Sequence, residues 1–477
     1  MPRLQEVQIG SRPIELLLPL VDEDRIDETS RVVEEMRRRM EGRTLWNVNS
    51  TGIGGGVAEM LRPLLGYVKS LGIDTRWLTI EGTSEFFEIT KRLHHALHGS
   101  EGDGSALGER ERAVYEQVLE ANAEELLRLI RPRDIVILHD PQTAGLAPHL
   151  VGSGAIVVWR CHVGDDKLDG QAELGWGFLA PYLEDVAAAV FSRNHFIPDC
   201  CDHGRSVVIP PSIDAFSAKN QELDDAAVRA ILVHAGLVEG PPGEGSPTYR
   251  RDDGSPGRVQ RQASVLRLGS APSWETPLVV QVSRWDPLKD PTGVMLGFAQ
   301  HVDGAGPTSP ALVLAGPTVG MVADDPEDTA VLEQVVAEWH RLPPSHRDRV
   351  HLASLPMTDV EENAAIVNAL QRHATVVVQK SLHEGFGLTV TEAMWKSRPV
   401  VASAVGGIQD QITDGVHGLL VHDPRDTRAV GAALARILGD RDYAAWLGGN
   451  AHRRVRDEYL VVRHLIQHAE LIERIDK

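Results

Sequence analysis

Two glutamates, Glu384 and Glu392, have the spacing best suited to chemistry in this chain. The residues between them include Gly385 and Gly387, and the segment follows an apolar run at 374–379. A glycine loop that opens a helix presents unpaired N–H groups and the positive end of the helix dipole, which suits a phosphate. Two carboxylates at this separation could hold a sugar and a ribose of one ligand. The pattern also fits a bland alternative, in which Glu384 caps the helix and Glu392 is an exposed helix residue.

A pair of cations, Arg284 and Lys289, follows a second apolar run at 277–283. A nucleoside diphosphate-sugar releases a negatively charged diphosphate, and fixed cations can neutralise that charge without a metal. The alternative is that both cations are ordinary surface residues paired with Asp286 and Asp290.

A run of three glycines, Gly54, Gly55 and Gly56, lies between a predicted strand at 45–49 and a predicted helix at 57–70. No Gly-Lys-Ser/Thr follows, so this is not a Walker loop, and it is not a clean dinucleotide fingerprint. The glycines could serve a phosphate, or only the close packing of the helix.

Two histidines, His139 and His162, end successive predicted strands at 134–138 and 155–159. A lone histidine at a strand end is more often structural, but two on one face of a sheet are harder to dismiss. Their neighbours Asp140 and Arg160 could hydrogen-bond the hydroxyl groups of an acceptor sugar.

Short apolar runs alternate with helical stretches along the chain, which predicts parallel sheets built from βαβ units. The remaining predicted strands lie at 76–80, 187–192, 206–209, 311–315, 349–352, 399–403 and 418–421. The remaining predicted helices lie at 331–340, 360–371 and 388–396.

We expect three parts: a first Rossmann-like domain at 1–213, a second at 214–454, and a C-terminal helical segment at 455–477 that packs back on the first domain. Residues 239–271 are rich in Gly, Pro, Ser and charge, and they contain too little apolar surface to offset the entropy of ordering. We therefore expect a mobile surface insertion there, with a regulatory or partner-binding loop as the alternative.

The overall composition limits the possible partners. The 477 residues are 42% hydrophobic and carry a formal net charge of −20, which argues against binding nucleic acid or an anionic membrane surface. The beginning of the chain has no signal-peptide pattern, and three cysteines are too few for a disulfide framework. We expect a cytoplasmic protein with reduced thiols, whose oligomeric state, a homodimer included, stays open.

The segment around the two glutamates resembles the paired-glutamate motif of glycosyltransferase family 4, whose members have the GT-B fold. The matching neighbours are Thr391, Ala393, Met394, Gly406 and Gly407. The resemblance implies two Rossmann-like α/β domains facing across a cleft. It implies that Glu384 holds the hydroxyls of the donor sugar, supported by the backbone of Phe386, Gly387 and Leu388, and that Glu392 holds the nucleotide ribose.

The same resemblance implies roles for the other loops. Arg284 and Lys289 resemble the diphosphate clamp of the family, and His162 resembles its histidine near the reacting carbon. The triple glycine would approach the donor phosphates. No obligatory metal or cofactor is implied; magnesium is compatible with the family but is not indicated by the sequence.

Several stretches resemble one subgroup, the trehalose glycosyltransferring synthases and the retaining trehalose phosphorylases. They lie at 47–56, 77–82, 85–91, 139–142, 159–162, 210–214 and 379–381. The resemblance implies reversible transfer of glucose from a nucleoside diphosphate-glucose to glucose, giving α,α-trehalose, with Glu81, Asp140 and Arg160 at the acceptor. The alternatives are a phosphorylase that uses phosphate and another family-4 hexosyltransferase. The nucleotide base and the direction of flux stay open.

Overall fold

The computed structural model describes residues 4–21, 23, 26–52, 55–168, 170–301, 309–320 and 328–476. The chain forms two compact units. The first comprises Met1–Ser212, Glu384–Phe386 and Val461–Lys477, and the second comprises Ile213–His383 and Gly387–Leu460.

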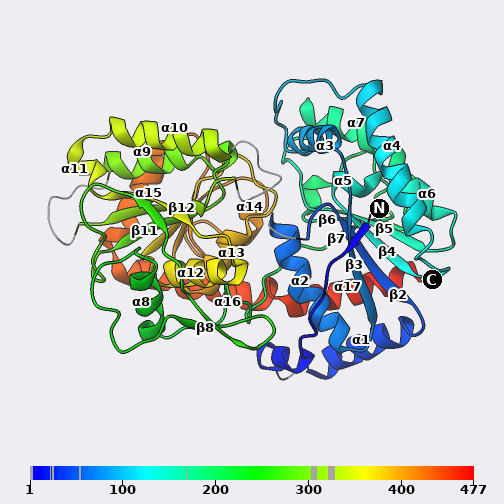
Figure 1. Ribbon diagram of the computed structural model, residues 1–477, viewed down its shortest axis with the longest axis horizontal. Helices are drawn as coiled ribbons and strands as arrows, with labels where there is room; N and C mark the ends of the chain where they lie inside the picture. The colour runs from blue at the N-terminus through cyan, green and yellow to red at the C-terminus, as the bar shows by residue number, and fades with distance from the viewer. Residues whose placement is uncertain are drawn as a thin grey trace. The chain divides into compact units, whose positions relative to one another are not determined.

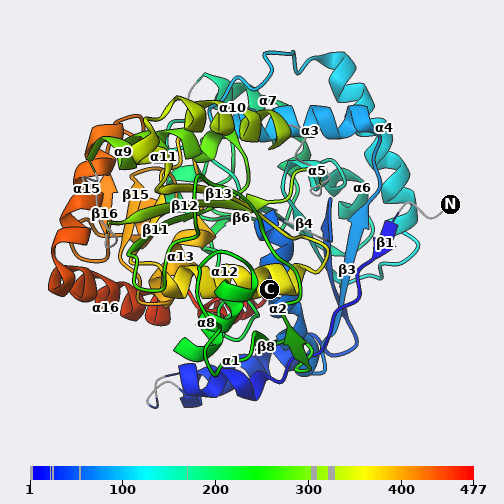
Figure 2. The ribbon, with the colours of Figure 1, turned by 60° about the vertical axis from the view of Figure 1, so that its left-hand side comes forward.

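The first unit contains a seven-stranded sheet with the order β1-β3-β2-β4-β5-β6-β7. Its parallel strands are β2 (Thr44–Asn49), β3 (Asp74–Ile80), β4 (Ile135–His139), β5 (Ile156–Cys161), β6 (Ala188–Phe191) and β7 (Ser206–Val208). These confirm the six strands predicted for this half of the chain. The seventh strand, β1 (Leu4–Glu6), was not predicted, and Figure 2 shows it at the sheet edge beside β3, with which it pairs antiparallel.

Helices cover both faces of this sheet (Figure 1). One group consists of α1 (Ile26–Arg39), α2 (Gly55–Ser70) and α17 (Val461–Ile475), in which α17 contacts both α1 and α2. The other consists of α3 (Ser84–Leu97), α4 (Glu109–Leu126), α5 (Pro141–Ala144), α6 (Ala147–Val151) and α7 (Gln171–Leu183). Every residue of β2, β4 and β6 is buried, as expected for parallel strands covered on both faces.

The second unit repeats this architecture with the strand order β10-β13-β12-β11-β14-β15-β16. Its parallel strands are β11 (Leu278–Val282), β12 (Ala311–Pro317), β13 (Val350–Leu355), β14 (Val376–Gln379), β15 (Val400–Ser403) and β16 (Leu419–Val421), which confirm the six predicted strands. Its longer helices are α8 (Asp225–His234), α9 (Pro291–His301), α10 (Asp328–Arg341), α12 (Val360–His373), α13 (Leu388–Trp395), α15 (Thr427–Gly439) and α16 (Arg441–Glu458). Both units are therefore Rossmann-like.

Residues 239–271 differ from the predicted mobile insertion, because they contain regular structure. The short strands β8 (Thr248–Arg250) and β9 (Pro256–Arg258) form an antiparallel hairpin, and β10 (Ser264–Leu266) pairs antiparallel with β13 at the edge of the second sheet. The prediction weighed only apolar burial, which is indeed sparse in this segment.

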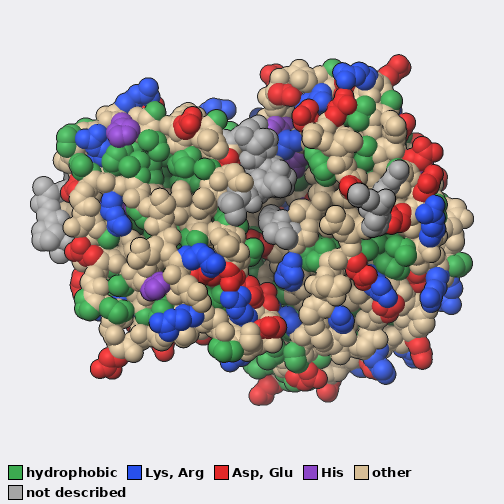
Figure 3. All heavy atoms as spheres, in the orientation of Figure 1, with side chains coloured by type: hydrophobic (Ala, Val, Ile, Leu, Met, Phe, Trp, Pro, Cys, Tyr) green, Lys and Arg blue, Asp and Glu red, His purple; other side chains and the backbone are tan. Residues whose placement is uncertain are grey.

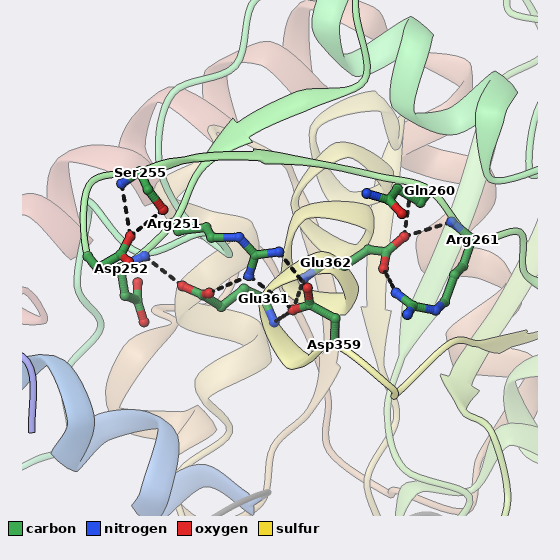
Figure 4. A network of polar contacts seen from close by, with 9 residues as sticks. Arg251, Asp252, Ser255, Gln260, Arg261, Asp359, Glu361 and Glu362 are labelled. Atoms are coloured by element: carbon green, nitrogen blue, oxygen red, sulfur yellow. Dashed lines mark hydrogen bonds and ion pairs between the residues drawn. The ribbon is translucent and has the colours of Figure 1, made fainter. Parts of the chain in front are cut away.

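Polar contacts with the beginning of α12 anchor the segment instead (Figure 4). The Arg251 guanidinium contacts the carboxylates of Asp359, at 2.5 Å, and Glu361, at 2.7 Å. The buried Glu362 carboxylate accepts hydrogen bonds from the backbone N–H of Gln260, at 2.6 Å, and of Arg261, at 2.7 Å. Carboxylates at the beginning of α12 thus accept hydrogen bonds from residues 239–271. The composition of that segment does not reveal these contacts with a distant helix.

The surface of the face shown in Figure 3 mixes acidic and basic side chains without a continuous basic area. Among the described residues, no helix is long and apolar enough to cross a membrane. Cys161, Cys200 and Cys201 are free thiols.

Candidate active site

In open α/β sheets, ligands bind beyond the carboxyl ends of the parallel strands. Most of the predicted site residues lie there: some follow β3, β4 and β5 of the first sheet, and others follow β11 and β14 of the second sheet.

The glutamate loop leads from β14 into α13, as predicted. Gly387 is the residue before the helix, with φ +85° and ψ +58°, and Leu388 is the first helical residue. This left-handed conformation is open to glycine and costly for most other residues, which explains why the loop has glycine at that position. Phe386, just before it, is buried.

We expect Gly387→Ala to lower the free energy of unfolding by about 1–2 kcal/mol, because a Cβ is disfavoured at this positive φ. Gly387→Asn is the matched control: asparagine tolerates the left-handed region better, so its loss should be smaller. Urea denaturation of both variants measures the difference. Equal stability of the alanine variant and the unsubstituted chain would contradict this account of the loop.

Glu392 is buried, with 3% of its surface exposed, so the alternative of an exposed helix residue is wrong. Its Oε1 atom lies 3.3 Å from Nζ of Lys219. A cation thus holds the carboxylate that the sequence assigned to a ribose. Lys219 was not predicted from the sequence, since it lies far from Glu392 along the chain and belongs to no recognisable motif.

Arg284 and Lys289 lie in the loop that follows β11, and Lys289 ends a short 3-10 helix at Pro287–Lys289. Arg284 Nη2 lies 3.3 Å from Asp286 Oδ2, which is one of the two pairings of the bland alternative. The other Asp of that alternative, Asp290, forms an ion pair with Lys380. Both predicted cations therefore occupy one strand-end loop.

Lys380 is a buried cation within the stretch 379–381, and no role was predicted for it from the sequence. It directly follows β14, has 1% of its surface exposed, and contacts Asp290 in the neighbouring cation loop. A Cβ at Gly293 would lie 2.6 Å from its Nζ atom, so the glycine leaves room for the lysine. The pair connects the loop after β14 with the loop after β11.

The triple-glycine loop is only partly described. Gly54 lies outside the described residues, Gly55 is the first residue of α2, and Gly56 is exposed in its first turn. The described glycines thus begin a helix, as expected for either of the two predicted uses. A role with a phosphate stays a prediction.

The two strand-end histidines of the first unit come together. The rings of His139 and His162 are nearly parallel, with 15° between their planes and centroids 5.4 Å apart, and Nδ1 of His139 lies 3.1 Å from Nε2 of His162. Nε2 of His139 lies 3.0 Å from Oδ1 of Asn47 on β2. Burial lowers the pKa of His139 to about 3, and it lowers the pKa of His162 well below the usual value, with the Arg160 charge adding to both shifts.

Asp140 supports the backbone next to His162. Its carboxylate accepts a hydrogen bond from the backbone N–H of His162 at 2.7 Å, and its own φ is +63°. Burial raises the pKa of Asp140 to about 7, against the opposing effects of this hydrogen bond and of Arg160. Within the same unit, a Cβ at Gly385 would lie 2.8 Å from the carbonyl oxygen of His162.

Arg160 differs from its predicted acceptor role. Its side chain is buried, with 1% exposed, and Nη1 lies 3.0 Å from Nε2 of His464 and 2.8 Å from Nε2 of His468, both on α17. Nη2 donates to the carbonyl of Ile209. Arg160 pairs in register with His139, so both side chains lie on the same face of the sheet, and α17 covers the Arg160 guanidinium there. Its guanidinium therefore fixes a helix rather than facing a sugar.

Glu81 follows β3 and is exposed. The side chain of Asn122 bonds the backbone N–H and C=O of Glu81, at 3.1 and 2.9 Å, which holds this strand end in place. The acceptor role of its carboxylate stays a prediction.

Comparisons with known proteins match both halves of the chain. Residues 47–198 match a family model described as trehalose synthase, N-terminal domain, and residues 360–454 match one described as glycosyl transferases group 1. A trehalose synthase of Thermococcus litoralis is 33% identical over 447 residues, covering 94% of each chain. A trehalose synthase of Rubrobacter xylanophilus is 34% identical over 435 residues, covering 91% of each.

A solved structure described as trehalose-6-phosphate from E. coli bound with UDP-2-fluoro glucose is similar in fold. It has a TM-score of 0.65 and 15% sequence identity, and the match covers 90% of this chain and 99% of the other. The two Rossmann-like units therefore have the GT-B fold.

Proposed function

Because the chain belongs to the trehalose synthase family of glycosyltransferases, we propose that it is a retaining enzyme that transfers glucose from a nucleoside diphosphate-glucose to glucose, forming α,α-trehalose. The observation that carries the proposal is the family match over nearly the whole chain. The cation pair after β11 and the buried carboxylate on α13 support a charged, hydroxyl-rich donor.

Each site residue then has a role. Glu384 binds the hydroxyls of the donor glucose, with the backbone of Phe386, Gly387 and Leu388 beside it, and Glu392 binds the ribose. Arg284 and Lys289 bind the diphosphate. His162 lies near the reacting carbon, and Asp140 and Glu81 serve the acceptor side.

The chemistry needs no enzyme-bound sugar. The acceptor hydroxyl attacks the anomeric carbon on the face from which the diphosphate departs, so the configuration is retained. The new carbon–oxygen bond forms as the bond to the phosphate oxygen breaks, and the departing phosphate takes the proton of the acceptor. Arg284 and Lys289 stabilise the charge that develops on it, so we propose that no metal is obligatory.

The partners are then small molecules, a nucleotide-sugar and a sugar. The free cysteines and the acidic surface support a cytoplasmic location. A screen of nucleoside diphosphate-glucoses against glucose and other acceptors, with the product identified by NMR, tests the proposal. Formation of α,α-trehalose is expected. A purified protein that cleaves trehalose only with phosphate, and uses no nucleotide-sugar, would overturn it in favour of the phosphorylase.

Glu392 separates these two functions. If Glu392 binds ribose, Glu392→Gln should raise the KM for the donor about 10- to 100-fold, since hydrogen bonds to a charged group contribute about 1.5–3 kcal/mol. The kcat should change little. Steady-state kinetics with varied donor measures the effect, and Glu333→Gln, an exposed glutamate on α10 of the same unit, is the matched control. An unchanged donor KM would exclude ribose binding by Glu392.

A further inference from the structure

We infer that Asn47 and His139 are positioning residues that hold His162 as a neutral imidazole with its proton on Nε2, so that Nδ1 accepts a hydrogen bond from a substrate hydroxyl. The inference rests on the proposed function for the identity of the substrate. The tautomer itself can be tested without any substrate.

The proton positions follow from one end of the chain of contacts. The structure orients the Asn47 amide with Oδ1 toward His139, and Nδ2 of the same amide is buried without a hydrogen-bond partner among the described residues. In this orientation Oδ1 can only accept, so the His139 nitrogen 3.0 Å away, Nε2, carries a proton. A neutral His139 then has a bare Nδ1, which accepts from the nitrogen 3.1 Å away, Nε2 of His162. His162 therefore carries its proton on Nε2, and its own Nδ1 is left as an acceptor.

Burial keeps both rings neutral. Asn47 and His139 are 2% and 1% exposed, so neither group can exchange its partner for water. The charged groups nearby do not favour an imidazolium. The Asp140 carboxylate is turned to the backbone N–H of His162, and the Arg160 guanidinium lies against α17. An ionised ring here would lie in a low-dielectric interior beside a cation, which is unfavourable.

Asn47, His139 and His162 form a hydrogen-bond relay, and its direction determines which hydrogen bonds His162 can make with a substrate. Among the described residues, Nδ1 of His162 has no hydrogen-bond partner, whereas Nε2 is engaged by His139. A neutral ring with an unprotonated Nδ1 accepts a hydrogen bond from a hydroxyl. Burial and the Arg160 charge hold the pKa of His162 well below its usual range, so the ring is a weak base, which agrees with a transfer in which the departing phosphate takes the proton. His162 then orients a hydroxyl next to the reacting carbon.

The relay is built from three neighbouring parallel segments. Asn47 lies on β2, His139 ends β4 and His162 directly follows β5, and β4 pairs with both β2 and β5. Strand spacing of about 4.8 Å brings side chains at adjacent strand ends within hydrogen-bond reach of one another. The sheet itself therefore positions the relay, so its geometry should persist without bound substrate.

The first experiment measures the tautomers directly. Long-range ¹H–¹⁵N correlation spectra of the protein with ¹⁵N-labelled histidine, assigned with His139 and His162 variants, report the protonation of each ring nitrogen. Between pH 6 and 8 we expect both rings to be neutral with the proton on Nε2. A proton on Nδ1 of His162, or an imidazolium signal from either ring, would overturn the inference.

The second experiment removes the anchor of the relay. Asn47→Leu takes away the acceptor, so His162 should show a mixture of tautomers, and kcat/KM should fall about three- to tenfold. Asn47→Asp keeps an acceptor oxygen and should restore the Nε2 tautomer of His162. Asn122→Leu is the matched control, because it also removes a buried amide from the first unit: it should leave the His162 tautomer unchanged. An unchanged His162 spectrum in Asn47→Leu would contradict a positioning role.

The two proposals can fail separately. If no nucleotide-sugar is used but the spectra show the Nε2 tautomer, the proposed function fails and the relay stands as a property of the sheet. If trehalose forms but the spectra show the other tautomer, the relay is wrong and the function stands.

Discussion

Replacing Arg284 and Lys289 together with methionine is expected to lower kcat by about 10³-fold or more. Both cations lie in the loop after β11, where the proposed reaction places the departing diphosphate. Removing a single group that stabilises charge developing in a transition state commonly lowers kcat by about 10²–10³-fold, and here two are removed. Methionine keeps much of the length and apolar surface of both side chains, so the change is chiefly one of charge.

The measurement is steady-state turnover at saturating donor and acceptor, so that weaker binding is separated from slower chemistry. Arg341→Met with Arg425→Met is the matched control, because it removes two exposed positive charges from the same unit and leaves the same net charge. We expect the control to keep its full kcat. A double variant at the site with less than a tenfold loss would show that these two cations do not stabilise the leaving group.

The second large effect is on stability in acid. Burial lowers the pKa of His139 to about 3, and it lowers those of His162, His464 and His468 well below the ordinary value. In the unfolded chain a histidine titrates near pH 6.5. Below that pH the unfolded chain binds protons that the folded chain excludes, so the free energy of unfolding falls as the pH falls.

Asp140 acts in the opposite direction. Burial raises its pKa to about 7, so the folded state binds a proton there before the unfolded state does. Its contribution is fully present below about pH 4 and is lost as the pH rises through 7. The four histidines outnumber the one carboxyl, so the net slope in the first unit is a loss of stability as the pH falls below about 6.5.

Urea denaturation at a series of pH values measures this slope. His468→Gln should make it shallower by up to about 1.4 kcal/mol per pH unit, since one excluded proton is removed. His422→Gln, at an exposed histidine, should leave it unchanged. In the second unit, burial also lowers the pKa values of His351 and His373 to about 4, so both units should lose stability in acid. A free energy of unfolding that is flat from pH 7 to 5 would contradict this account.

Local patterns in the sequence predict the strands and the glutamate loop well. The apolar run at 374–379 and the glycine before Leu388 favour a strand and a helix start through contacts between neighbouring residues. The structure has β14 and the beginning of α13 at those places. The antiparallel edge strand β10 was missed for a local reason as well. Its three residues lie in a segment whose composition is typical of a loop.

Contacts between distant residues could not be predicted in this way. Lys219 with Glu392, and Lys380 with Asp290, join segments that neither periodicity nor composition relates. The same holds for Arg160, whose type and position at a strand end suit a sugar ligand equally well. Its contacts with His464 and His468, which follow it by 304 and 308 positions, decide between a sugar and a helix.

The contact of Arg160 with α17 has a consequence for the order of synthesis. His464 and His468 follow Arg160 by 304 and 308 positions, and the second unit is translated in between. A ribosome adds about 5–20 residues per second, so roughly 15–60 seconds separate the synthesis of Arg160 from that of His464 and His468. During that interval the nascent first unit lacks the two histidines that contact Arg160 in the finished chain, because α17 is the last helix to be synthesised.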